Sequence, residues 1–129
     1  MRQIIDVYNG SPKGGRLLVS NRKSVDLQLK TEHMQYLLVA YDGTDPGAME
    51  RRLKVRPEHF SRIGLLKKAG EFLSGGAILD ENGTMIGSMI VYEYPDRRSL
   101  DEQLKSEPYY TGVVWVKIEI QPFKLAKIE

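Results

Sequence analysis

The fold is decided by residues 72–93, FLSGGAILDENGTMIGSMIVYE. Two mostly apolar runs, residues 72–79 and 84–93, flank the turn-forming residues Asp80-Glu81-Asn82-Gly83. Asn-Gly is a strong hairpin signal because both residues tolerate a positive φ. The segment therefore predicts two antiparallel strands joined in a tight hairpin through residues 80–83.

A strand and a helix are expected before this hairpin. Residues 34–41 form a short apolar run that ends at a loop rich in Gly and Pro, so we expect a buried first strand. Residues 48–54 predict one or two helical turns. Pro57 suits the first position of a longer helix, which Gly70 would close just after Ala69.

A second helix and a last strand are expected after the hairpin. Ser99 and Glu102 have the spacing of a capping box, which predicts a short helix from Ser99 that ends before Pro108. Residues 113–121 alternate apolar and polar, as a half-buried strand does. The resulting order, β-α-β-β-α-β, predicts an α+β ferredoxin-like unit with two helices on one face of an antiparallel four-stranded sheet.

The other face of this sheet also needs a cover. Met89 and Val91 alternate with Ile90 and Tyr92, so both faces of that strand are apolar. Face-to-face packing of two sheets in a homodimer would bury the second face.

Residues 1–33 do not fit the ferredoxin-like unit, and we expect them to form an N-terminal β extension to a domain of residues 34–129. Apolar residues near 4–7 and 17–19 could pair as an antiparallel hairpin across a Gly-rich turn. Such strands could extend a sheet edge or clasp a partner subunit.

Composition excludes several classes of protein. A chain of 129 residues with 41% hydrophobic content can bury a core without disulfides or metal, and the absence of cysteine fits a reducing, cytoplasmic compartment. No apolar run approaches the ~20 residues of a membrane span. Nineteen basic and seventeen acidic residues are interleaved, so we expect neither nucleic-acid nor membrane binding.

His59 and Asp80 are the expected acid/base pair. His59 shares a helix face with Ile63 and Leu66, which aims the imidazole toward the sheet. Imidazole changes charge near neutral pH, and a carboxylate can fix its tautomer and stabilise imidazolium. The alternatives are structural: a rim histidine bonded to a carbonyl, and an aspartate that accepts from turn amides.

Three further side chains are expected to bind a substrate. Arg56 could clamp a carboxylate or pair with Glu58, and Tyr109 could line a pocket or pack in the core. Ser88 suits a hydrogen-bond donor, since no nucleophile elbow surrounds it. The two histidines lack metal-ligand spacing and no nucleotide fingerprint is present, so we expect no metal and no cofactor.

Four pieces of the chain together resemble the YciI-like (YCII-related) family. They are residues 52–59 (RLKVRPEH), residues 75–80 (GGAILD), Gly87-Ser88 and Glu107-Pro108-Tyr109. The resemblance spans about residues 34–125 and implies a dimeric α+β barrel whose subunits each carry a cleft with a histidine and an aspartate. It assigns these two roles to His59 and Asp80, and the family's Gly-Ser pair to Gly87 and Ser88. The chain departs from the family at Glu107, where Asp is commoner, and in its N-terminal extension.

The resemblance implies cofactor-free proton chemistry, such as a dehydrochlorinase-like step. We therefore expect a cofactor-independent lyase or isomerase that uses His59 for isomerisation, elimination or dehydrohalogenation of a small cyclic or aromatic-derived metabolite. A non-catalytic small-molecule-binding or sensing dimer is one alternative. A cofactor-free monooxygenase or a muconolactone-isomerase-like protein on the same architecture is another.

Overall fold

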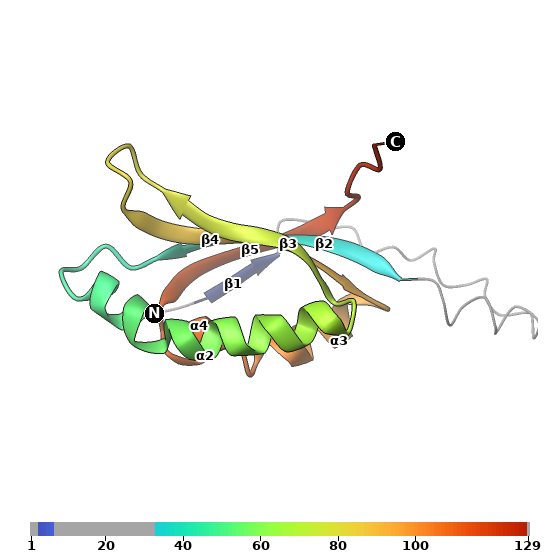
Figure 1. Ribbon diagram of the computed structural model, residues 1–129, viewed down its shortest axis with the longest axis horizontal. Helices are drawn as coiled ribbons and strands as arrows, with labels where there is room; N and C mark the ends of the chain where they lie inside the picture. The colour runs from blue at the N-terminus through green and yellow to red at the C-terminus, as the bar shows by residue number, and fades with distance from the viewer. Residues whose placement is uncertain (1–2, 7–32, 129) are drawn as a thin grey trace, which may run out of the picture.

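The computed structural model describes residues 3–6 and 33–128 as one sheet with its helices on one face (Figure 1). The elements are β1 (Gln3–Asp6), β2 (Met34–Asp42), α2 (Ala48–Lys68), β3 (Phe72–Leu79), β4 (Met85–Tyr94), α3 (Arg97–Leu104), α4 (Pro108–Thr111) and β5 (Trp115–Phe123). The strand order is β1-β5-β2-β4-β3, and each neighbouring pair among the last four is antiparallel. The predicted ferredoxin-like α+β fold is confirmed.

β1 adds a fifth strand by pairing parallel to β5, with Gln3 beside Lys117. Residues 3–6 thus extend a sheet edge, which is one of the arrangements expected from the sequence. The predicted hairpin partner at residues 17–19 lies outside the described residues.

The two faces of the sheet differ in their surroundings. In β2, Tyr36, Leu38 and Ala40 are buried in the core cluster beneath the helices. Leu37 and Val39 point to the opposite face, because successive strand residues alternate sides. Both are half-buried, and the register sets Val39 beside Met89 of β4. The face that carries no helix therefore has an apolar patch on β2 and β4, while Glu119 of β5 lies opposite Val39 on the other side of β2.

α2 is longer than predicted and contains Pro57 within its 21 residues. The expected break is wrong, although proline removes one main-chain hydrogen bond from a helix interior. Two ion pairs anchor the turn before it to the preceding loop and strand: Arg51 to Asp45, with Nη2–Oδ1 at 2.6 Å, and Arg52 to Asp42. The buried pair of Arg52 and Asp42 ties the first turns of α2 to β2.

The predicted tight hairpin is confirmed, and its turn contains three residues. Asp80 N–H donates to Thr84 O at 2.9 Å, and Gly83 N–H donates to Asp80 O at 3.0 Å. Three residues therefore separate the paired ends Asp80 and Thr84. Gly83 has φ +85°, whereas Asn82 has no positive φ. This is the type I turn followed by a left-handed glycine that three-residue hairpins favour.

α3 begins two residues before Ser99. Asp96 caps it, since its carboxylate accepts from Ser99 N–H at 2.9 Å and from Ser99 Oγ at 2.8 Å. The predicted capping box is wrong because Ser99 occupies the third helical position and Asp96 supplies the stronger acceptor. The helix ends before Pro108, as predicted.

α2 and α4 end in the same hydrogen-bonded turn. After α2, Gly70 N–H donates to Lys67 O and Glu71 N–H donates to Leu66 O. After α4, Val113 and Val114 donate to Tyr110 and Tyr109 in the same pattern, which is the Schellman motif. Its left-handed position holds Gly70 at φ +79° in the first case and Val113 at φ +57° in the second.

Candidate functional site

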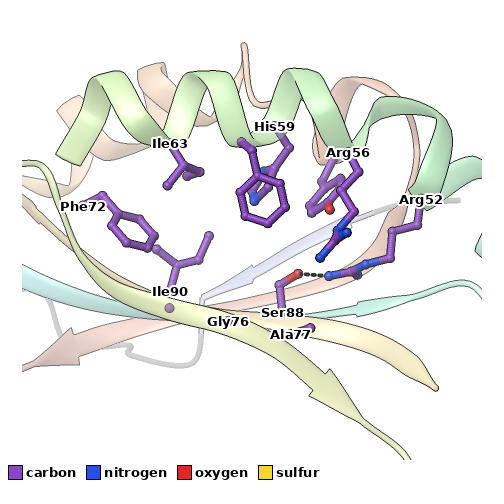
Figure 2. A pocket seen from close by; sticks show the side chains of 12 residues that line it. Arg52, Arg56, His59, Ile63, Phe72, Gly76, Ala77, Ser88 and Ile90 are labelled. Carbon is purple, nitrogen blue, oxygen red and sulfur yellow. Dashed lines mark hydrogen bonds between the residues drawn. The ribbon is translucent and has the colours of Figure 1, made fainter. Parts of the chain in front are cut away.

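A pocket of about 80 Å³ lies between α2 and the sheet, over β3 and β4 (Figure 2). Its lining residues are Arg52, Arg56, His59, Phe60, Ile63, Phe72, Gly75, Gly76, Ala77, Ser88, Ile90 and Tyr109. β3 is an edge strand, and its central residues 75–77 are exposed. The pocket therefore opens over this edge of the sheet.

One face of α2 supplies the polar side of the pocket. Arg52, Arg56, His59 and Ile63 follow each other at spacings of four, three and four residues, which places them on a single helix face. Figure 2 shows them descending from α2 toward the sheet. Along this face the chemistry changes from two guanidinium groups, through an imidazole, to an aliphatic side chain.

His59 interacts with Glu107, the residue just before α4, through a buried side-chain hydrogen bond. His59 Nδ1 lies 2.7 Å from Glu107 Oε2, and the His59 side chain is 9% exposed while that of Glu107 is fully buried. The same oxygen accepts the Tyr109 N–H at 2.9 Å, because Glu107 caps α4 just before Pro108. The Tyr109 ring stacks on the imidazole with centroids 3.9 Å apart. Two contacts thus fix the orientation of His59.

Asp80 does not join this arrangement. Its Oδ1 accepts from Asn82 N–H at 2.8 Å and from Thr84 N–H at 2.9 Å, and Asp80 is not among the lining residues. The predicted pairing of His59 with Asp80 is corrected to His59 with Glu107. The physical reason is local: the aspartate satisfies turn amides that would otherwise lack partners.

Arg52 and Ser88 form a buried network at one end of the pocket. Arg52 Nη1 donates to both oxygens of Asp42 at 3.0 and 2.9 Å, and Arg52 Nη2 donates to Ser88 Oγ at 3.1 Å. Ser88 Oγ also accepts from Trp115 Nε1 at 3.1 Å. Burial raises the pKa of Asp42, and the Arg52 hydrogen bond and charge oppose that shift. Ser88 keeps its own proton to donate.

Arg56 and Tyr109 take part in fewer side-chain hydrogen bonds than Arg52 and Ser88. Arg56 is half-buried, and its guanidinium lies 4.8 Å from the centre of the Phe60 ring. The Tyr109 hydroxyl is buried without a hydrogen bond of good geometry. Burial raises the pKa of Tyr109, while the charges of Arg52 and Arg56 act in the opposite direction. The structure thus brings Arg56, His59, Ser88 and Tyr109 to one pocket.

The described residues contain no candidate for a metal-ligand cluster or for a membrane-spanning helix. No group of three or more histidine, aspartate or glutamate side chains in this part of the chain could hold a metal ion. No helix within residues 33–128 is long and apolar enough to cross a membrane.

The model of the YCII-related domain matches residues 34–124. The chain belongs to this family. The protein YciI of Escherichia coli O6:H1 is 30% identical over 97 residues, which are 70% of this chain and 97% of that protein. An uncharacterized protein of Haemophilus influenzae is 29% identical over the same shares of the two chains. The family expected from the four sequence pieces is confirmed.

Among solved structures, the YCII-related chain is similar to a 5-chloro-2-hydroxyhydroquinone dehydrochlorinase, TftG, from Burkholderia phenoliruptrix, in complex with 2,5-dihydroxybenzoquinone. The TM-score is 0.62, with 18% identity over 72% of this chain and 96% of that one. At this identity the similarity supports the fold.

Sequence reasoning missed two members of this YCII-related site. Glu107 lies 48 residues from His59, and Asp42 lies 10 residues from Arg52, so only the tertiary structure joins them. A signal for Glu107 was present, because an acidic residue directly before a proline is a favourable helix N-cap. No comparable pattern marked the buried pair of Asp42 and Arg52.

Proposed function

We propose that this protein is a cofactor-independent enzyme that transfers a proton on a small cyclic or aromatic-derived metabolite. The observation that carries the proposal is the 2.7 Å contact between His59 Nδ1 and Glu107 Oε2 beside the pocket. A histidine held by a buried carboxylate is a common general base.

The two ring nitrogens of His59 would have separate tasks. Glu107 Oε2 accepts the N–H at Nδ1, which leaves the lone pair of the neutral imidazole at Nε2. Nε2 would take a proton from a carbon next to a carbonyl, or from a hydroxyl, and return it elsewhere on the substrate. Glu107 would stabilise the imidazolium formed in between, so it acts as a positioning residue.

The remaining lining suits a compact ring. Ile63, Phe72 and Ile90 supply apolar contacts, while Arg56, Ser88 and Tyr109 would bind substrate oxygens. The structural similarity to a dehydrochlorinase that binds 2,5-dihydroxybenzoquinone supports elimination from a hydroxylated ring as one form of the reaction. Isomerisation would use the same base.

We also propose that two copies pack their helix-free sheet faces together. The apolar surface around Val39 and Met89 supports this arrangement, which would form a dimeric α+β barrel. The lack of cysteine supports a cytoplasmic location.

Proton transfer can be tested by solvent exchange. A panel of cyclic 1,3-diketones and hydroxyquinones in D₂O would be followed by NMR for enzyme-dependent loss of ring C–H signals. His59→Gln is expected to slow the exchange by about 100-fold, within the range for loss of a general base. His33→Gln is the matched control, because His33 lies outside the pocket and should keep the wild-type rate.

Equal exchange by wild type and His59→Gln would contradict the role of His59. Tight binding of a panel member without exchange or product formation would favour the alternative, a small-molecule-binding or sensing protein. Oxygen consumption during turnover would instead indicate a monooxygenase.

A further inference from the structure

The two arginines that line the pocket differ in whether a carboxylate neutralises their charge. Arg52 gives Nη1 to both oxygens of Asp42 and Nη2 to Ser88, and its side chain is only 3% exposed. Its positive charge is therefore balanced inside the protein by Asp42, and its Nε is buried without a hydrogen-bond partner among the described residues. Arg52 supports the wall of the pocket and has little capacity left for a ligand.

Arg56, one helical turn further along α2, is in a different position. No carboxylate of the described residues makes an ion pair with it, and no aspartate or glutamate lines the pocket. Figure 2 shows its guanidinium directed into the pocket beside His59. A half-buried guanidinium that has no carboxylate partner favours a planar oxyanion, which it can bind through two hydrogen bonds.

The Tyr109 hydroxyl provides a second group for the same ligand atom. It is buried, lines the pocket and lacks a well-aligned hydrogen bond, which costs free energy unless a ligand supplies the partner. Its ring is stacked on His59, so the hydroxyl is held at a fixed position relative to the imidazole.

We propose that Arg56 and Tyr109 Oη form an oxyanion subsite that selects negatively charged ring compounds and sets their orientation over His59. The anionic oxygen binds at Arg56, the reacting C–H faces His59 Nε2, and the ring rests against Ile63 and Phe72. His59 follows Arg56 by three positions along the helix, which is a rise of about 4.5 Å and matches the width of one small ring. This inference rests on the proposed function for the reacting atom, but the binding step does not require it.

The subsite can be tested by binding alone. Benzoate and benzamide have nearly the same shape and differ in charge, and 2,5-dihydroxybenzoquinone provides an enolic oxyanion in place of a carboxylate. Each would be titrated into ¹⁵N-labelled wild type, Arg56→Gln, Arg56→Lys and Lys54→Gln, with affinities taken from amide shifts. Lys54→Gln removes a positive charge from an exposed position of α2 outside the pocket, which makes it the matched control.

Wild type is expected to bind at least one of the two anions about tenfold more tightly than benzamide. Arg56→Gln should lower that preference to about twofold or less, Arg56→Lys should keep part of it, and Lys54→Gln should keep all of it. The anion with the larger dependence on Arg56 identifies carboxylate or enolate as the preferred group.

The subsite is wrong if wild type binds neither anion in preference to benzamide, or if Arg56→Gln leaves the preference unchanged. His59→Gln separates this result from the proposed function. That variant should lose solvent exchange yet keep the anion preference, whereas Arg56→Gln should lose the preference while its imidazole pair with Glu107 stays intact.

Discussion

Asp42 and Asp45 make ion pairs of different kinds with neighbouring arginines of α2. The pair of Asp42 and Arg52 is buried, with side-chain exposures of 4% and 3%, whereas that of Asp45 and Arg51 is exposed. Asp42→Asn should lower the free energy of unfolding by about 3 kcal/mol, because it leaves a buried guanidinium without its counter-charge. Asp45→Asn should change stability little, since solvent screens surface pairs. Urea unfolding of both variants checks this, and equal effects would contradict it.

At the level of single residues, the sequence predicted which side chains line the pocket better than which ones pair. Helical periodicity aimed His59 at the sheet, and Arg56 precedes it by three residues on the same face. Helical periodicity could not predict the partner of His59, because Glu107 lies outside α2, at the N-cap of α4. Asp80 was predicted as the partner of His59 because it is a carboxylate, yet it accepts hydrogen bonds from the turn amides of Asn82 and Thr84.

The ends of α2 and α4 allow a paired prediction about elements. Both turns require a left-handed residue, for which glycine has no steric penalty and a β-branched residue has a substantial one. Val113→Gly should therefore stabilise the protein by about 1 kcal/mol, and Gly70→Ala should destabilise it by a similar amount. Thermal unfolding measures both. A loss of stability in Val113→Gly would show that the Val113 side chain makes contacts worth more than the strain.

Element types followed from local patterns, while element boundaries depended on tertiary contacts. The strand at residues 34–41 and the hairpin strands were found because apolar runs between Gly, Pro and Asn residues are local signals. The unbroken α2 was not predicted, since the buried ion pair of Arg52 with Asp42 that ties its first turns to β2 is a tertiary contact. α3 likewise begins at Arg97, because Asp96 is a stronger N-cap than Ser99.

At the scale of the whole molecule, the helix-free sheet face predicts the oligomeric state. Analytical ultracentrifugation should find a dimer for wild type and a folded monomer for Val39→Asp, because a carboxylate on this face cannot be buried against a second copy. Leu65→Asp is the matched control, since Leu65 is 67% exposed on α2, and it should remain dimeric. Circular dichroism would verify that each variant is folded. A wild-type monomer, or a dimeric Val39→Asp, would contradict the arrangement.

The proposed function requires that Glu107 hold His59 with Nε2 free to act as a base. A long-range ¹H–¹⁵N correlation spectrum of the imidazoles tests it directly, with the His59 signals assigned from their loss in His59→Gln. We predict that neutral His59 carries its proton on Nδ1, donated to Glu107 Oε2 at 2.7 Å, with an unprotonated Nε2. A neutral imidazole protonated on Nε2 would contradict the account, because no lone pair would then face the pocket.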